Sequence, residues 1–143
     1  MNLVIDASVL IKFYVPEVLF DRAERLLANV EKGDIELSAP DLIYPEVGNI
    51  LWKKNRLKEL TRSEAEEITD AILSFPLKIE VSKPLLPLTV DIAIAYGITV
   101  YDASYLSLAK VYETTLITAD RKLVDVLAKT DLKDSVIWLG SYK

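Results

Sequence analysis

Short apolar runs alternate along the chain with longer segments in which apolar residues recur every three or four positions. The short runs predict buried strands and the longer segments predict amphipathic helices. The predicted strands cover residues 3–5, 35–37, 77–81, 116–118 and 136–139. The predicted helices are a brief one from Ser8, one from Glu17 to just before Gly33, one from about 40 to 57, one from 62 to 75, one from 85 to 96, one from Asp102, and one from 123 to 129. This alternation of strands and helices predicts an α/β fold with a parallel sheet.

Local start and stop signals support these helices. Thr61 and Glu64 fit a capping box, in which each side chain accepts a hydrogen bond from the other residue's backbone N–H. Gly33 and Gly97 stand where a glycine commonly closes a helix. With 143 residues and no linker, repeat or low-complexity segment, the chain has the size of one compact domain. We therefore expect a single domain over residues 1–143.

Composition favours a protein that lies outside the membrane. Hydrophobic residues form 51% of the sequence, but charged residues interrupt them everywhere. No stretch approaches the roughly 20 apolar residues that a membrane span requires. The N-terminus lacks the basic segment and small-residue cleavage site of a signal peptide. The expected location is cytoplasmic, with no membrane partner.

The chain contains no cysteine and no histidine. Thiolate catalysis, Ser-His-Asp triads, zinc sites built from Cys or His, and cleavage of RNA by paired imidazoles are therefore excluded. Carboxylates, hydroxyls, Lys, Arg and Tyr remain for demanding chemistry.

The net charge of −5 argues at first against a polyanionic partner. If four acids surround divalent cations, however, 18 acids remain against 17 bases. Contacts with nucleic acid would then come from local basic patches and from the metal itself.

Four acids interrupt apolar segments. Asp6, Asp102 and Asp120 each follow an apolar run, and Glu46 lies on the apolar stripe of its predicted helix. An unpaired charge at such positions would be costly. The ends of parallel strands, where Asp6 and Asp120 lie, are also where open α/β sheets bind ligands.

Each acid has a simpler explanation when it is taken alone. Asp102 fits a helix N-cap, Glu46 fits an ion pair with Lys or Arg, and an acid after a strand fits an Asx-turn. The combination favours another explanation. Two charges about 4 Å apart repel by roughly 4 kcal/mol at an effective dielectric near 20, so four clustered carboxylates require a cation.

An all-oxygen site selects hard divalent ions, Mg²⁺ or Mn²⁺. Phosphoryl transfer is the chemistry that uses such a site, because a metal-bound water becomes a nucleophile for in-line attack. Ser8 and Thr118 lie two residues from Asp6 and Asp120 and are placed to orient a water or a phosphate. Equally, Ser8 fits an N-cap and Thr118 fits an ordinary β-branched strand residue.

Four segments in order resemble PIN-domain ribonucleases, in particular the VapC-like toxins of type II toxin–antitoxin pairs. The segments are VIDASVL at residues 4–10, PEVGNIL at 45–51, YDASYLSLA at 101–109 and LITADRKL at 116–123. Each motif alone is weak, but together they span nearly the whole chain.

The resemblance implies a three-layer α/β/α PIN-like fold with a central, mainly parallel sheet. It implies a site in which Asp6, Glu46, Asp102 and Asp120 bind Mg²⁺ or Mn²⁺, lined by Ser8 and Thr118. It further implies endonucleolytic cleavage of single-stranded RNA and homodimerisation. A VapB-like antitoxin would inhibit the enzyme by placing an Arg or Lys in the acidic groove, because a guanidinium can bind carboxylates through two hydrogen bonds.

Other polar residues have weaker assignments. Asn49 matches a recurrent polar position one turn beyond Glu46 and is expected behind the ligands. Asp91 and Asp125 are expected to be solvated or salt-bridged. Candidates for contact with the RNA backbone, each of which also fits a solvated helix face, are Lys12, Lys53, Lys54, Arg56, Arg121 and Lys122.

Three alternative functions remain open. A phospho-acceptor signalling domain is also a small α/β unit that binds Mg²⁺, but two adjacent acids would follow its first strand, whereas Ala7 and Ser8 follow Asp6 here. A stable acyl-phosphate after incubation with acetyl phosphate would favour it. A catalytically silent PIN module and a PIN nuclease that is not a toxin are the other two. A small upstream antitoxin-like reading frame would separate a toxin from the last of these.

Overall fold

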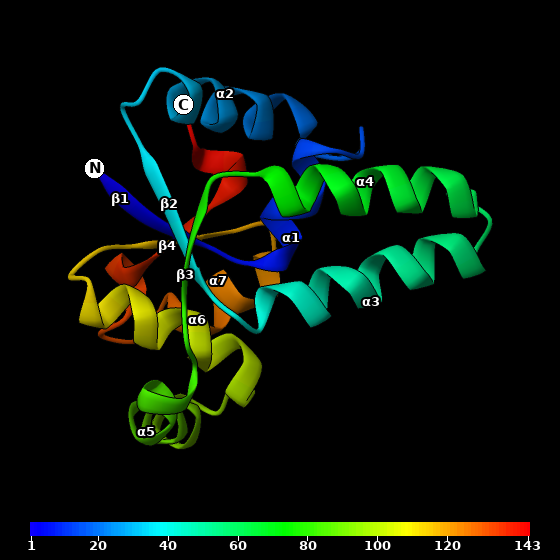
Figure 1. The fold of residues 1–143 in the computed structure, drawn as a ribbon. Helices are drawn as coiled ribbons and strands as arrows, with labels where there is room; N and C mark the ends of the chain where they lie inside the picture. The colour runs from blue at the N-terminus through cyan, green and yellow to red at the C-terminus, as the bar shows by residue number, and fades with distance from the viewer.

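The computed structural model describes residues 1–143 and contains one five-stranded sheet (Figure 1). Its strands are β1 (Asn2–Ile5), β2 (Glu36–Pro40), β3 (Leu77–Glu80), β4 (Leu116–Thr118) and β5 (Val136–Trp138). Their order is β3-β2-β1-β4-β5 and every neighbouring pair is parallel. The chain builds the sheet outward from β1 to β3 and then crosses to the other side of β1. The strand order therefore reverses between β1 and β4, which is where sheets of this kind bind ligands.

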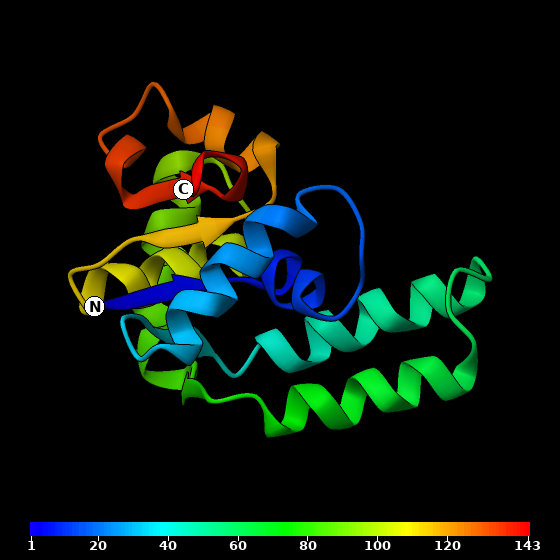
Figure 2. The ribbon, with the colours of Figure 1, turned by 90° about the horizontal axis from the view of Figure 1, so that it is seen from above.

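Helices cover both faces of the sheet. They are α1 (Ala7–Leu10), α2 (Phe20–Glu31), α3 (Ile43–Arg56), α4 (Arg62–Ser74), α5 (Leu86–Tyr96), α6 (Val100–Val111) and α7 (Arg121–Leu127). Short 3₁₀ turns cover Ile11–Phe13, Lys83–Leu85, Lys133–Ser135 and Leu139–Ser141. Figures 1 and 2 show α2 over one face of the sheet, α5 and α6 over the other, and α3 and α4 as an antiparallel pair that projects beyond it. The predicted three-layer α/β/α architecture is confirmed.

One core of 29 buried hydrophobic residues joins the layers. Ile5, Leu37 and Ile117, on three adjacent strands, are fully buried. Strands covered on both faces require such continuous apolar runs, which is why the short apolar segments of the sequence predicted them correctly.

Several predicted helix ends are confirmed, but the starts of two helices are wrong and the helix predicted over 123–129 spans Arg121–Leu127 instead. Both bonds of the capping box between Thr61 and Glu64 are present, and Gly97 ends α5 in the left-handed conformation. The second helix begins at Phe20 and not at Glu17, because Leu19 has a φ of 70° that a helix cannot accommodate. The helix predicted from Asp102 begins earlier, at Val100, because the side chain of Thr99 caps it.

No single helix is long and apolar enough to cross a membrane. By length and composition, only the bent pair formed by Lys83–Tyr96 and Val100–Val111, which meet at 116°, passes the same test jointly.

Candidate active site

A cavity of about 520 Å³ opens beside the C-terminal ends of β1 and β4, at the reversal of strand order. All four predicted ligands line it, although they come from four different parts of the chain. Its polar lining consists of Asp6, Ser8, Glu46, Asn49, Tyr101, Asp102, Tyr105 and Asp120. The structure therefore brings together the acids that the sequence singled out.

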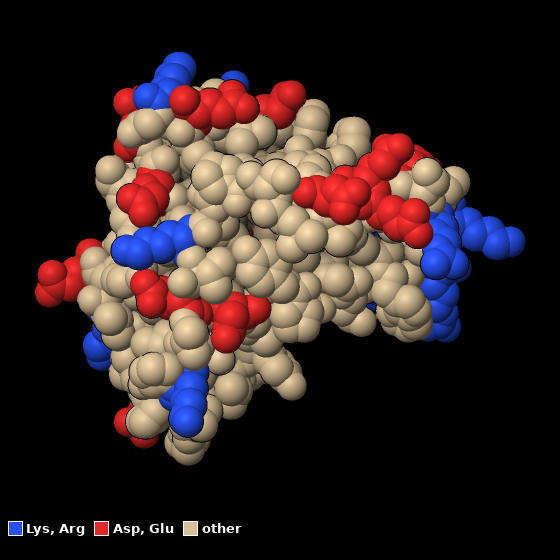
Figure 3. Space-filling model, viewed as in Figure 1, with Lys and Arg blue, Asp and Glu red and all other residues tan.

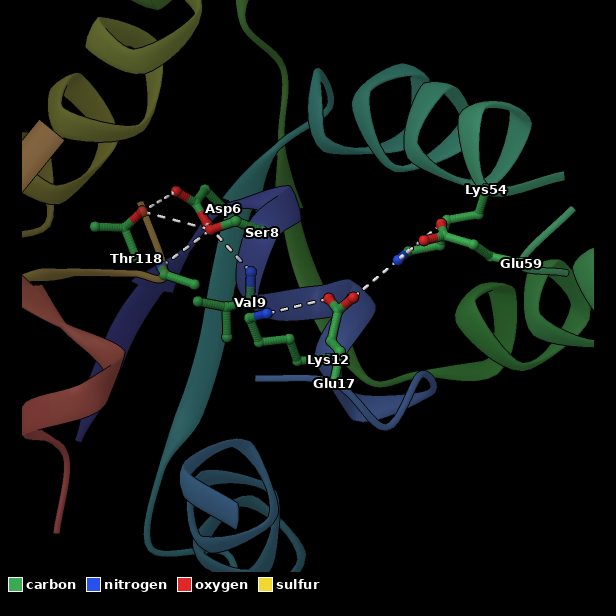
Figure 4. Close-up of polar contacts among 9 residues, drawn as sticks. Asp6, Ser8, Val9, Lys12, Glu17, Lys54, Glu59 and Thr118 are labelled. Carbon is green, nitrogen blue, oxygen red and sulfur yellow. Dashed lines mark hydrogen bonds and ion pairs between the residues drawn. The ribbon is translucent and has the colours of Figure 1, made fainter. Parts of the chain in front are cut away.

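Asp6 is the most buried of the four acids, with 7% of its surface exposed. It ends β1 and caps α1, because its Oδ1 accepts a hydrogen bond from the Val9 N–H at 3.2 Å. Ser8 Oγ donates to the same oxygen, and Thr118 Oγ1 donates to Oδ2 (Figure 4). Burial raises the pKa of Asp6 to about 6, against the lowering effect of these three hydrogen bonds, and the nearby charge of Asp102 adds to the rise.

Ser8 and Thr118 fix Asp6 rather than merely flanking it. Besides donating to Asp6, Ser8 Oγ accepts from the Ala119 N–H, and Thr118 Oγ1 accepts from the Asp120 N–H, both at 3.0 Å. These bonds tie the chain after β1 to the chain after β4. Ser8 is not the N-cap of α1, since Asp6 has that role. Thr118 is a strand residue, as its β-branched side chain suggested, but its hydroxyl contacts Asp6 and not the cavity.

Glu46 reaches the cavity from the first turn of α3 and is half-buried. Its partner is the phenol of Tyr105, which donates a hydrogen bond to its Oε1. No Lys or Arg pairs with it, so the alternative of an ion pair is wrong. Burial raises the pKa of Glu46, the bond from Tyr105 lowers it, and the charge of Asp102 raises it.

Tyr105 is a site residue that the sequence analysis missed. Its side chain is almost fully buried, and burial followed by the neighbouring Glu46 raises the pKa of its phenol, so the hydroxyl remains a hydrogen-bond donor. The signal was present in the sequence, because Tyr105 lies three residues after Asp102 and therefore on the same side of α6.

Asp102 is half-buried and Asp120 is exposed, so both are more accessible than Asp6. Asp102 is the third residue of α6 and is not its N-cap, which is Thr99. Burial and then the charge of Asp120 raise the pKa of Asp102. Asp120 is exposed and caps α7, where its Oδ1 accepts hydrogen bonds from the backbone N–H groups of Lys122 and Leu123.

The donor set of the cavity suits a hard cation. Every candidate ligand atom is a carboxylate or hydroxyl oxygen, and Asp6, Glu46 and Asp102 each have a pKa raised in part by another acid of the cavity. A divalent ion would offset that repulsion. With the side chains in their present positions, no three acids are close enough to hold one ion. The structure thus gathers the four candidate ligands in one cavity without closing them around a single point.

Two of the acids outside the predicted ligand set also lie outside the cavity. Asp91 is exposed on α5, and Asp125 pairs with Arg121 at 3.2 Å. The guanidinium of Arg121 lies over the ring of Trp138, 4.4 Å from its centroid. Both acids therefore have the solvated or salt-bridged character that was expected of them.

Of the six residues predicted to contact the RNA backbone, Arg121 pairs with Asp125 and Lys122 is exposed, and the other four divide into two groups. Lys12 and Lys54 are largely buried and both bind Glu17, at 3.0 and 2.8 Å, so neither presents a free charge (Figure 4). Lys53 and Arg56 are exposed on α3 and form no ion pair. The sequence did not separate the two groups, because Glu17 was expected inside a helix.

Comparisons with known proteins agree with this geometry. Residues 3–129 match the PIN domain family. Ribonuclease VapC3 from Pyrobaculum aerophilum is 36% identical over 127 residues, which cover 87% of this chain and 94% of that protein. The crystal structure of PAE2754 from the same organism has a TM-score of 0.71 at 28% identity, covering 99% of this chain and 85% of that one. A toxin–antitoxin complex from Klebsiella pneumoniae has a TM-score of 0.65 at 15% identity, covering 94% and 95%; at that identity it shows the fold alone.

Proposed function

The chain belongs to the PIN domain family, and on this basis we propose that it is a metal-dependent ribonuclease of the VapC type that cleaves single-stranded RNA internally. The observation that carries the proposal is the cavity at the reversal of strand order, which is lined by Asp6, Glu46, Asp102 and Asp120. The relative named Ribonuclease VapC3, aligned over 87% of this chain, supports RNA as the substrate.

The same four acids would hold Mg²⁺ or Mn²⁺ in this proposal. A bound ion of this kind supplies a water of lowered pKa as the nucleophile and neutralises charge on the phosphate. The protein's part is to keep the carboxylates ionised and oriented. Hydrogen bonds from Ser8 and Thr118 favour the ionised form of Asp6, and the phenol of Tyr105 fixes the carboxylate of Glu46.

The mode of cleavage follows from the proposed nucleophile, a metal-activated water. With a water as nucleophile, the RNA 2′-hydroxyl takes no part, so the products carry 5′-phosphate and 3′-hydroxyl ends.

We further propose a VapB-like antitoxin as the partner and a homodimer as the assembly, in a cytoplasmic setting. The Klebsiella pneumoniae neighbour is a toxin–antitoxin complex with the same fold. An acidic cavity with raised carboxylate pKa values is stabilised by any inserted cation, and an Arg or Lys from an antitoxin would supply one.

The test of this function uses an unstructured RNA oligonucleotide with labels at both ends. Internal cleavage is expected with Mn²⁺ or Mg²⁺ and none with EDTA, and the products should be substrates for ligation through 5′-phosphate ends. Cleavage that persists in EDTA, or products with cyclic phosphates, would contradict the proposed mechanism. No cleavage with either ion would favour a silent PIN module.

A further inference from the structure

An exposed tryptophan lies at the free end of the α3–α4 pair, away from the acids. Trp52 has 57% of its surface exposed although it sits within a helix. The guanidinium of Arg56, one turn further along α3, lies 5.5 Å from the centroid of its ring. The side chain packs neither in the core nor against another aromatic ring. Its large flat surface is therefore available to a ligand.

The position of Trp52 on α3 connects it to the acidic cavity. Asn49 lines that cavity, and residues three and four positions apart on a helix are neighbours on its surface. Trp52 and Lys53 follow Asn49 at those spacings, and Arg56 follows them by one more turn. At a rise of about 1.5 Å per residue, this flank of α3 leads roughly 10 Å from Asn49 to Arg56.

The charges along this flank are positive and free. Lys53 and Arg56 have no acidic partner, in contrast to Lys54 beside them, which binds Glu17. Figure 3 shows Lys and Arg side chains gathered at the free end of the α3–α4 pair, whereas Asp and Glu side chains cover α4. A polyanion would therefore lie along α3 and avoid α4. Lys and Arg side chains in the last turn of a helix also complement the helix dipole, but that effect does not explain why a tryptophan is exposed there.

A shallow cavity of about 360 Å³ adjoins the ring, between α3 and α4. Its polar lining consists of Trp52, Asn55, Thr69 and the ion pair of Arg62 with Glu66, whose charged groups lie 3.0 Å apart. Its volume falls in the range of ordinary ligand pockets. A planar group that stacks on Trp52 thus has polar atoms within reach of its edge.

We propose that Trp52, Lys53 and Arg56 form a binding surface for single-stranded RNA, distinct from the acids and continuous with them through Asn49. A base stacks on Trp52 while Lys53 and Arg56 contact the phosphates beside it. Stacking of this kind needs an unpaired base and tolerates any sequence. The inference rests on the proposed function, because it concerns how the same substrate is held.

The test uses the fact that the chain has only two tryptophans. Trp138→Phe leaves Trp52 as the only one, and it removes no hydrogen bond because Trp138 Nε1 has no partner. An unstructured RNA of about 12 nucleotides is titrated into this variant in EDTA, so that no cleavage occurs. Stacking on Trp52 should quench its fluorescence in parallel with binding measured by anisotropy of the labelled RNA.

Substitutions in the otherwise natural chain separate the contributions. Trp52→Ala should weaken RNA binding about 5- to 150-fold, the usual loss for one stacked base, and Trp52→Phe should recover most of it. Changing both Lys53 and Arg56 to Gln should reduce the slope of log affinity against log salt by about 1.4. Matched controls are Val111→Ala for an exposed apolar residue and Lys129→Gln with Lys133→Gln for two exposed charges; they should change neither quantity.

The outcomes distinguish this inference from the function on which it rests. Unchanged RNA affinity in Trp52→Ala, unquenched fluorescence, or the absence of any RNA binding would overturn the inference, while metal-dependent cleavage would still support the nuclease. If RNA quenches the fluorescence and Trp52→Ala loses affinity, but no metal supports cleavage, the RNA-binding surface would be supported and the nuclease function contradicted. A changed oligomeric state of Trp52→Ala in light scattering, with unchanged RNA affinity, would assign the patch to self-association and overturn the inference.

Discussion

The phenol of Tyr105 donates a hydrogen bond to the carboxylate of Glu46 across 59 positions of sequence. The bond joins α6 to α3 and gives a direction to an acid that reaches the cavity from the side of a helix. Asp6 and Asp120 each follow a strand and cap a short helix, and Asp6 is also held by the hydroxyls of Ser8 and Thr118. Glu46 caps no helix, so it depends on Tyr105 for its placement.

Tyr105→Phe should therefore weaken the site without unfolding the protein. Loss of a hydrogen bond that orients a ligand typically costs 10- to 100-fold in metal affinity or activity. We expect a fall of that size in the rate of RNA cleavage at limiting Mn²⁺, recovered in part at high Mn²⁺. The control is Tyr112→Phe, which removes a phenol that donates to Glu80, outside the cavity. Equal losses in the two variants would mean that Tyr105 acts through general stability.

Thr118→Val should shift the dependence of cleavage on pH. The hydrogen bond from Thr118 lowers the pKa of Asp6, so its loss raises that pKa further. If ionised Asp6 holds the metal, the acidic limb of the pH–rate profile moves to higher pH. Thr89→Val is the control. It removes a buried hydroxyl that lies outside the cavity and forms a hydrogen bond of 2.9 Å with Ser107. An unshifted acidic limb in Thr118→Val would contradict a role for this bond in the site.

The metal-free protein should lose stability as pH rises through the titration of Asp6. Its pKa in the fold is about 6, above its usual value of 3.8, so the folded state binds the proton more tightly than the unfolded chain. The contribution is fully present below about pH 4 and is lost as pH rises through about 6, by about 3 kcal/mol in the limit. The measurement is chemical denaturation in EDTA from pH 4 to 7.5. Asp6→Asn should flatten this part of the profile, and an unchanged slope in that variant would contradict the assignment.

The cluster of Lys12, Glu17 and Lys54 should contribute to stability rather than to RNA binding. Burial raises the pKa of Glu17, but the hydrogen bonds and charges of Lys54 and Lys12 outweigh it and lower that pKa. Because both lysines are only 12–15% exposed, Glu17→Ala leaves two poorly solvated charges and should cost about 1 to 3 kcal/mol in denaturation. Glu66→Ala, which breaks an exposed pair with Arg62, should cost much less. An equal cost would show that burial adds nothing to the Glu17 cluster.

Much of the fold could be predicted because its determinants are local. The apolar runs of β1 and β4, the capping box at Thr61 and the glycine after α5 each act over a few residues, and each prediction is confirmed. The gathering of Asp6 and Asp120 at one edge of the sheet also follows from strand direction alone. Glu46 and Asp102 line the same cavity from helices α3 and α6, which strand direction does not explain.

The remaining features depend on contacts between distant residues. The start of α2 was misplaced because the apolar periodicity continues through Glu17 and Val18. In the structure, the left-handed backbone of Leu19 precedes the helix, and Glu17 forms ion pairs with two lysines outside it. The partners of Glu46 and Asp6 could not be read from spacing, since the bonds from Tyr105 and Thr118 span 59 and 112 residues. A pattern identifies a residue that needs a partner, but only the packing shows which partner it has.

The central claim is that the acids of one cavity, and not acidity in general, support cleavage of RNA. The most direct measurement compares rates of cleavage of a single-stranded RNA in Mn²⁺ by Asp102→Asn and Asp125→Asn. Each substitution removes one carboxylate from a helix, but only Asp102 lines the cavity, while Asp125 pairs with Arg121 outside it. Asp102→Asn should lower the rate at least about 100-fold, since it would remove a proposed metal ligand, and Asp125→Asn should leave it nearly unchanged. Full activity of Asp102→Asn, or equal losses in the two variants, would contradict the account.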